Sequence, residues 1–243
     1  MEENIIKYKS IVKNMTASEI INWALKEFRI DRIALASSLN AEDQVLTDII
    51  VKSDKSARIF TIDTGRLHQE TYDAIYATMQ KYDIHYEILF PENTAIENMV
   101  SEYGPNLFYE SLENRKMCCS LRKLEPLKRI LSKLDAWICG LRTEQSVTRK
   151  GVSKIEWDEN NNLFKINPLA EWSEKDIWNY IHENNVPYNR MNDFRYPSIG
   201  CAPCTRAVKK GEDFRAGRWW WEEAESKECG LHFKNGKLVR IKE

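Results

Sequence analysis

The chain has 243 residues, of which 42% are hydrophobic and 30% are charged, and its formal net charge at pH 7 is −1. These values are ordinary for a soluble globular protein, and the balanced charge gives no bulk reason to bind nucleic acid or an anionic membrane surface. No apolar stretch approaches the roughly 18 residues of a membrane span. The first residues, MEENIIKYKS, place charges inside a short apolar run and are not typical of a signal peptide. We therefore expect a soluble, cytoplasmic protein.

Short apolar runs alternate with longer helical patterns through the first half of the chain. Four runs predict strands: 31–37, 57–62, 84–90 and 135–140. Three segments predict helices: 41–52, 67–82 and 121–134. This alternation predicts an α/β fold, in which a parallel sheet is flanked by helices. Ligands of such sheets bind at the carboxyl ends of the strands, where this chain carries three polar loops: SSLNAED, DTGRLHQE and GLRTEQSVTR.

The second half begins with a predicted hairpin, 152–158 and 162–168, and continues with an amphipathic helix, 172–185. Within that helix Ser173 and Asp176 have the spacing of a capping box. Pro, Gly, Arg and aromatic residues follow, with little periodicity. We expect an irregular C-terminal segment that is held by something other than regular packing.

Six cysteines favour metal binding or redox chemistry over structural disulfides, because the cytoplasm keeps thiols reduced. Two close pairs stand out, Cys118 with Cys119 and Cys201 with Cys204. Four thiols in two pairs can hold zinc or an iron–sulfur cluster. The C-x-x-C pair fits zinc, whereas the adjacent pair is more easily accepted by a larger cluster, and two unrelated pairs of buried thiols are the alternative. Cys139 lies in an apolar run and is predicted to be a core residue.

Cations gather around both cysteine pairs in an otherwise nearly neutral chain. They are Arg115, Lys116, Arg122, Lys123, Arg206, Lys209, Lys210, Arg215 and Arg218. They can balance the charge of a thiolate cluster or hold an anionic substrate, and a solvated basic face is the plain alternative. Neither a phosphate-binding P-loop nor a dinucleotide fingerprint is present. The SSLNAED loop can cradle an anion at a helix N-terminus, although Ser and Asn are also ordinary caps.

The last cysteine, Cys229, stands apart in the sequence KECGLH, three residues before His232. A reactive thiol needs exposure and an electropositive setting that stabilises the thiolate. A cysteine in a tail near arginines and a histidine can have both. The residues alone leave open whether Cys229 is a nucleophile or an idle surface thiol.

Several long motifs together resemble the assimilatory adenylyl-sulfate reductases, the iron–sulfur branch of the phosphoadenylyl-sulfate reductase family. In chain order they are DTGRLHQETYD, KMCCSLRKLEPL, NPLAEWSEKDIWNYI, VPYN, PSIGCAPCTRAV, GEDFRAGRWWWE and KECGLH. The similarity extends from about Ala34 to His232. It implies an adenine-nucleotide α-hydrolase-like, PP-loop-related sheet, in agreement with the strand–helix pattern.

The resemblance also implies an activity. The enzyme would reduce adenylyl sulfate to sulfite and AMP in assimilatory sulfate reduction for cysteine biosynthesis. Its catalytic thiol would be Cys229, which forms an S-sulfocysteine that thioredoxin or a similar dithiol then reduces. The two cysteine pairs match the family's ligands to a [4Fe–4S] cluster: Cys118, Cys119, Cys201 and Cys204.

The same resemblance supplies candidate substrate contacts. Lys123, Arg215 and Arg218 match the sulfate-binding cations, and His232 matches the tail histidine. Ser37 and Arg66 match the nucleotide loops, while Ile62 and Gly140 would meet adenosine mainly through their backbones. The first loop departs from the family pattern at Leu39 and Asn40, where small residues are common. This departure puts in doubt whether Ser37 or Ser38 contacts phosphate, and we favour Ser37.

Three alternatives compete with this interpretation. Phosphoadenylyl sulfate is the alternative substrate, alone or beside adenylyl sulfate, although relatives specialised for it typically lack the two cysteine pairs. An ATP pyrophosphatase would need an S-G-G-x-D-S-type loop, which SSLNAED is not. A non-catalytic metal-binding module is the third.

The expected organisation is a single reductase domain over residues 1–243. It comprises a nucleotide-binding core over roughly 30–185, followed by a cluster-binding segment and mobile catalytic tail over 186–243. No nucleic acid or membrane partner is expected, and a homo-oligomer is compatible with the sequence.

Overall fold

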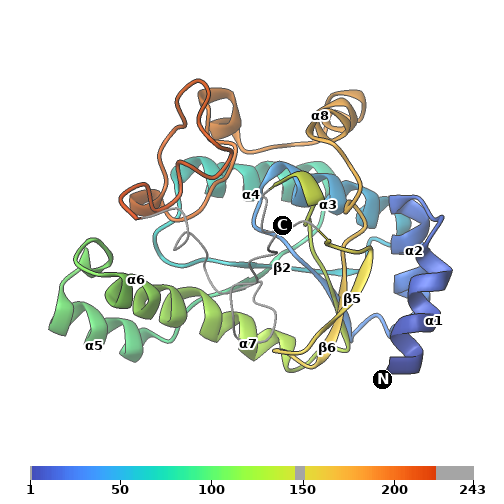
Figure 1. The fold of residues 1–243 in the computed structure, drawn as a ribbon, viewed down its shortest axis with the longest axis horizontal. Helices are drawn as coiled ribbons and strands as arrows, with labels where there is room; N and C mark the ends of the chain where they lie inside the picture. Colours follow the sequence, from blue (N-terminus) through green and yellow to red (C-terminus); the bar gives the residue numbers. More distant parts are fainter. Residues whose placement is uncertain (1, 146–150, 223–243) are drawn as a thin grey trace, which may run out of the picture.

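The computed structural model describes residues 2–145 and 151–222. Its centre is a six-stranded sheet with the order β3-β2-β1-β4-β6-β5 (Figure 1). The strands are β1 Ile33–Ala36, β2 Arg58–Ile62, β3 Glu87–Leu89, β4 Ala136–Ile138, β5 Ile155–Asp158 and β6 Leu163–Ile166. Neighbouring strands run parallel except for β5 and β6, which pair antiparallel at one edge.

Helices cover both faces of this sheet (Figure 1). The α-helices are α1 Glu2–Val12, α2 Ala17–Glu27, α3 Ala41–Ser53, α4 Gln69–Tyr82, α5 Asn93–Tyr103, α6 Leu112–Cys119, α7 Glu125–Leu131 and α8 Glu174–Glu183. A π-helix, Ser120–Leu124, joins α6 to α7, and short 3-10 helices include Leu107–Tyr109, Thr143–Gln145, Arg190–Phe194 and Ala202–Cys204. None of the helices in the described ranges has both the length and the apolar character to cross a lipid bilayer.

The two faces of the sheet are buried by alternate residues of the same strands. Ile33 and Leu35 of β1 join a core that includes α2, α3 and α8, whereas Ala34 between them packs into a second core with Leu127 and Ile130 of α7. Because side chains alternate along a strand, apolar residues at every position bury both faces. The sheet is therefore buried on both faces and gives firm support to the loops at its carboxyl edge.

The predicted parallel sheet is confirmed, and so is the capping box. Ser173 N donates to Asp176 Oδ2 at 2.8 Å, and Asp176 N donates to Ser173 Oγ at 3.2 Å. The predicted hairpin is also present, but it extends the main sheet, because β6 pairs in parallel with β4. The predicted helix 121–134 begins as the π-helix and becomes α7.

The segment after α8 is irregular, as expected, and is drawn orange to red in Figure 1. It packs on the strand-end loops through backbone contacts, such as Ala202 N donating to Arg66 O at 2.8 Å. It also folds on itself, since Thr205 and Arg218 form an antiparallel bridge and Trp219 is buried. These contacts fix the position of the segment, which has little regular secondary structure.

A candidate active site at the carboxyl edge of the sheet

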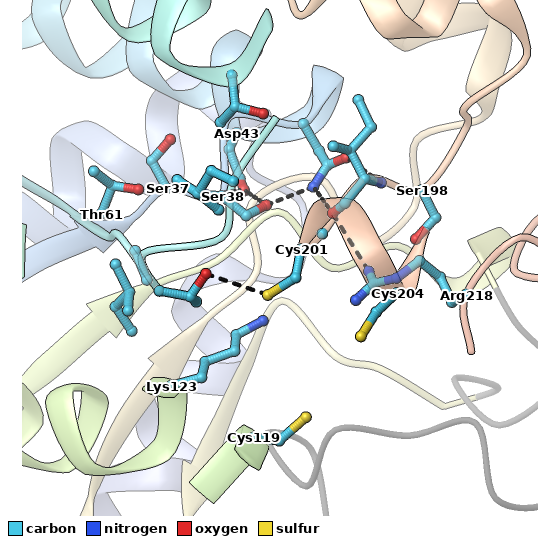
Figure 2. Close-up of a pocket in the computed structure, with 18 of the residues that line it drawn as sticks. Ser37, Ser38, Asp43, Thr61, Cys119, Lys123, Ser198, Cys201, Cys204 and Arg218 are labelled. Carbon is cyan, nitrogen blue, oxygen red and sulfur yellow. Dashed lines mark hydrogen bonds between the residues drawn. The ribbon is translucent and has the colours of Figure 1, made fainter. Parts of the chain in front are cut away.

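A cavity of about 230 Å³ lies where β1, β2 and β4 end, beneath the irregular segment (Figure 2). All three loops that the sequence places at strand ends contribute to its wall. The predicted site residues within the described ranges all line it: Ser37, Ile62, Arg66, Cys118, Cys119, Lys123, Gly140, Cys201, Cys204, Arg215 and Arg218. The predicted nucleophile Cys229 and its neighbour His232 lie outside the described residues. The roles predicted for these residues stay predictions.

The first loop is strained. Leu39 is 1% exposed and has a φ of 59°, a left-handed conformation that a bulky residue rarely adopts. Ser37 is buried, and its Oγ accepts from Leu39 N at 3.3 Å. Ser38 instead directs both its N–H and its hydroxyl to Asp43 Oδ2, at 2.7 and 2.6 Å. Strain of this kind persists only where surrounding contacts enforce it, and it is common at functional sites.

Asp43 is the buried anchor of this loop, at the start of α3. Burial is the main cause that raises the pKa of its carboxyl to about 6, although hydrogen bonds from Ser38 and from the Gly140 backbone oppose the shift. The folded pKa lies above the ordinary value of 3.8. The contribution of Asp43 to the free energy of unfolding is therefore fully present below about pH 4. It falls by about 3 kcal/mol as the pH rises through about 6.

We expect Asp43 to be half protonated near pH 6. A protonated carboxyl has a carbonyl stretch that a carboxylate lacks, so infrared difference spectra between wild type and Asp43→Asn isolate this group. The band should disappear with a midpoint near pH 6 as pH rises. Complete loss of the band by pH 4 would contradict the burial argument.

Gly140, directly after the buried Cys139, touches this anchor. An added Cβ would lie 2.5 Å from Asp43 Oδ1 and 2.8 Å from Glu42 Cβ. No side chain fits between β4 and the start of α3, so the close approach of these two elements requires glycine at this position.

Gly140→Ala is expected to reduce the free energy of unfolding by about 1–3 kcal/mol, because overpacking must move the start of α3. Thermal unfolding measures this loss as a drop in Tm of about 2–4 °C for each kcal/mol. Gly104→Ala is the control, since its φ is +79° and an added methyl group meets nothing within 4 Å. That variant should show backbone strain alone, about 1 kcal/mol. Equal stability of Gly140→Ala and wild type would contradict this argument, because it would show that the start of α3 moves aside without energetic cost.

The first cysteine pair ends α6, where the chain passes into the π-helix. Steps of three or four residues bring Arg115, Cys118, Cys119, Arg122 and Lys123 to one side of this continuous helix, and all five line the cavity. π-helical turns are rare and are frequently found at functional sites. Burial raises the pKa of the Cys118 thiol, and the charge of Arg122 opposes that shift.

The second cysteine pair lies across the cavity on the irregular segment (Figure 2). Cys201 Sγ lies 3.2 Å from Thr64 Oγ1, so the loop after β2 contacts one thiol directly. Cys204 is buried, and burial is the main cause that raises the pKa of its thiol, with Cys201 and Cys119 adding to the shift. The fold therefore brings both sequence pairs to one cavity.

The arrangement of the four thiols bears on what they can hold. In residues 2–145 and 151–222, no group of three or more Cys, His, Asp or Glu side chains is placed to bind one metal ion. A single tetrahedral ion would need sulfur ligands about 3.8 Å apart. Cysteine thiolates are the usual ligands of iron–sulfur clusters. The chemistry of this all-sulfur donor set, with arginines beside it, fits such a cluster.

The predicted cations differ in what surrounds them. Lys123 extends from the π-helix into the cavity toward Cys201 in Figure 2. Arg215 lies in a turn, whereas Arg218 forms the isolated bridge with Thr205 and is 9% exposed. Arg66 lines the cavity, but its guanidinium donates to Pro105 O and Asn106 Oδ1 and lies over the Phe108 ring. The cavity wall thus carries several fixed positive charges beside the thiols.

The sequence of the chain matches the model of a known family. The model of the phosphoadenosine phosphosulfate reductase domain matches residues 32–207, which is more than half of the chain. The chain belongs to the phosphoadenosine phosphosulfate reductase family. The resemblance inferred from the motifs is thereby confirmed at the level of the family.

Two relatives and one solved structure illustrate this membership. The chain is 51% identical over 220 residues to adenosine 5'-phosphosulfate reductase of Allochromatium vinosum, covering 90% of this chain and 85% of that protein. It is 49% identical over 204 residues to the protein of the same name from Burkholderia cepacia, covering 84% and 82%. Phosphoadenylyl-sulfate reductase of Candida auris, solved as a phosphate complex, superimposes with a TM-score of 0.74 at 26% identity, covering 86% and 98%. The predicted fold class is confirmed by this structural match.

Two contacts in this member of the phosphosulfate reductase family were not predicted from its sequence. Arg142 is 2% exposed and pairs with the buried Glu42 at 2.9 Å, which ties the loop after β4 to the start of α3. Asn40 binds the backbone of Ile199 in the irregular segment. The only sequence signal for the second contact was the departure of Asn40 from the family's small residues.

Proposed function

We propose that this chain is an adenylyl-sulfate reductase, which reduces adenylyl sulfate (adenosine 5'-phosphosulfate) to sulfite and AMP in sulfate assimilation for cysteine biosynthesis. The observation that carries the proposal is the 45–51% identity to proteins of that name over four fifths or more of the chain. The cavity supports the proposal, because the serine loop, the cations and the thiols all line it, and it is large enough for part of a small ligand.

The nucleophile in this proposal is the Cys229 thiolate. It attacks the sulfur of the sulfate group, so that a sulfur–sulfur bond forms and the bond from sulfur to the bridging phosphate oxygen breaks. AMP leaves with the electron pair of that bond, and Cys229 carries the sulfonate. A dithiol such as thioredoxin then attacks the Cys229 sulfur and releases sulfite. Its second thiol resolves the mixed disulfide, so the dithiol supplies both electrons.

The described cations have a clear task in this chemistry. The substrate is a dianion, and negative charge grows on the phosphate oxygen as AMP leaves. Lys123, Arg215 and Arg218 line the cavity where that charge would sit. Fixed cations in a partly closed site stabilise developing charge strongly, because they need no reorganisation during the reaction. The loop of Ser37 would take the phosphate, and the ends of β2 and β4 at Ile62 and Gly140 would face adenosine.

We propose that the two cysteine pairs hold a [4Fe–4S] cluster: Cys118, Cys119, Cys201 and Cys204. When bound, the cluster would supply structural order and a polarising charge next to the cations. The chain's own contribution is to neutralise the thiolates, through Arg115 and Arg122 on the π-helix side and through the Thr64 hydroxyl at Cys201. The domain layout follows: a nucleotide-binding core over roughly 30–185, then a segment that binds the cluster and carries the catalytic tail.

Sulfite formation tests the proposed function. Cluster-containing protein with thioredoxin should release sulfite and AMP from adenylyl sulfate, and at least 10-fold more slowly from phosphoadenylyl sulfate at equal low concentration. Faster turnover of phosphoadenylyl sulfate would reassign the substrate. Absence of sulfite from both substrates would overturn the reductase proposal and favour a metal-binding module.

A further inference from the structure

The Asn40 side chain joins two parts of the site that lie 159 residues apart in the sequence. Ile199 N donates to Asn40 Oδ1 at 3.0 Å, and Asn40 Nδ2 donates to Ile199 O at 3.4 Å. The same Nδ2 donates to Ser38 Oγ at 2.7 Å. The orientation of the amide is fixed, because a backbone N–H can only meet the amide oxygen. The Asn40 amide therefore bonds to both backbone polar groups of Ile199, its N–H and its carbonyl oxygen.

The backbone at Ile199 and Gly200 in turn supports Arg218. Arg218 Nη1 donates to Ile199 O at 3.3 Å, the carbonyl that Asn40 also contacts. At Gly200 an added Cβ would lie 2.8 Å from Arg218 Nη1 and closer still to Cζ and Nη2, so the guanidinium lies against bare backbone. Arg218 Cζ also lies 4.7 Å from the Trp219 ring centroid. The position of the guanidinium thus follows the position of Ile199.

A continuous line of contacts results, from Asp43 through Ser38, Asn40 and Ile199 to Arg218. Figure 2 labels Asp43, Ser38 and Arg218 of this line. Two residues next to this line have strained backbone conformations. Leu39, beside Asn40, has a φ of 59°, and Trp219, after Arg218, has a φ of 40°. Bulky residues hold such conformations only where neighbouring contacts enforce them. The line is therefore a set of mutually dependent contacts and not a chance approach of two surfaces.

We propose that Asn40 is a positioning residue that fixes Arg218 relative to the serine loop, so that the two halves of a phosphosulfate are bound together. This inference rests on the proposed function. A phosphosulfate has two oxyanions joined through one oxygen, and AMP has only the first. The serine loop would meet the phosphate and Arg218 the sulfate, so the tie between them matters only for a ligand that reaches both. Asn40 acts through Arg218 and does not touch the reacting atoms.

The test compares Kd values for adenylyl sulfate and for AMP in a Cys229→Ser background, which prevents turnover. Asn40→Ala should weaken adenylyl sulfate binding about 10-fold and AMP binding less than about 2-fold. Arg218→Ala should weaken adenylyl sulfate binding by a similar factor or more. Adding Asn40→Ala to Arg218→Ala should then cause no further loss, because the residue that Asn40 positions is gone.

Three outcomes would overturn the inference: equal weakening of both ligands, additive losses in the double variant, or no effect of Asn40→Ala. Asn189→Ala is the matched control. Asn189 is 1% exposed and also joins two segments, through Thr71 Oγ1 at 3.0 Å and Met191 N at 3.1 Å. It should lower stability without changing the ratio of the two Kd values.

Two further arms keep the test decisive. If Asn40→Ala does not fold, the isosteric Asn40→Asp replaces it, since aspartate accepts from Ile199 N but cannot donate to Ile199 O or Ser38. It should lose more than 10-fold in adenylyl sulfate affinity, and unchanged affinity would overturn the inference. If the Cys229→Ser background binds AMP but not adenylyl sulfate, the proposed function fails. If that background binds both and Asn40→Ala keeps their ratio, the inference alone fails.

Discussion

Replacing Gly200 with alanine should lower kcat/KM for adenylyl sulfate by about 100-fold while changing the free energy of unfolding by less than about 1 kcal/mol. The added methyl group would collide with three guanidinium atoms of Arg218: it would lie 2.8 Å from Nη1 and closer still to Cζ and Nη2. A flexible side chain can swing away at small energetic cost, so the fold survives. The cation, however, leaves the position where the sulfate is expected, and loss of one such charge-stabilising group typically costs 100- to 1,000-fold in rate.

A second substitution identifies the cause of that loss. Arg218→Ala should be at least as impaired as Gly200→Ala, and the double variant should be no worse than Arg218→Ala alone. Steady-state sulfite release and thermal unfolding on the same preparations separate activity from stability. Full activity of Gly200→Ala would show that Arg218 tolerates displacement. A large fall in Tm would show instead that Gly200 serves the fold.

Replacing Glu222 with alanine should reduce the free energy of unfolding by about 3–5 kcal/mol. Glu222 Oε1 lies 2.8 Å from Arg115 Nε, and the two side chains are 8% and 1% exposed. A second contact at 2.8 Å joins Nη2 to Oε2, so the pair is bidentate. Removing the carboxylate takes away the bidentate partner of a guanidinium that is buried against the Trp219 ring and beside Cys119. The pair also connects α6, which carries Cys118 and Cys119, to the segment that carries Cys201 and Cys204, so retention of the proposed cluster should fall in parallel.

The controls for Glu222→Ala use the contrast between buried and exposed pairs. Asp31→Ala breaks the Arg29–Asp31 pair, whose side chains are 79% and 57% exposed, and should change stability by less than about 1 kcal/mol. Glu222→Gln keeps an oxygen acceptor and the shape, so it should lie between wild type and alanine. Denaturant unfolding gives the stabilities, and iron content per chain gives the retention. A Glu222→Ala protein as stable as Asp31→Ala would refute the role of the pair.

Much of the fold was predictable because local patterns coincide with tertiary structure. Apolar runs alternating with helices predicted β1 to β4, and the polar loops at their ends line the cavity. The capping box marked the start of α8 within two residues. The helices α1, α2, α5 and α6 were not predicted. α6 contains the sequence LENRKMCC, in which charged residues obscure the apolar period, and it is fixed by contacts with the C-terminal segment such as Arg115 with Glu222.

The chemistry of the candidate site was more predictable than its geometry. Thiols, serines and cations were found by residue type and by motif, since their chemistry is local. The π-helix after Cys119 and the strained φ of Leu39 were not predictable, because neighbouring elements enforce them. The same holds for the pairing of Asn40 with Ile199 and of Glu42 with Arg142, where each partner is set by the packing of distant segments.

Intact-mass spectrometry tests the central claim most directly. Cluster-containing wild type and Cys229→Ser are mixed with adenylyl sulfate in the absence of any reductant. The wild type should gain the mass of one SO3 group per chain as AMP is released, and Cys229→Ser should gain nothing. Such a result identifies the nucleophile, the leaving group and the class of reaction together. No adduct on the wild type with either adenylyl sulfate or phosphoadenylyl sulfate, or an equal adduct on both proteins, would contradict the account.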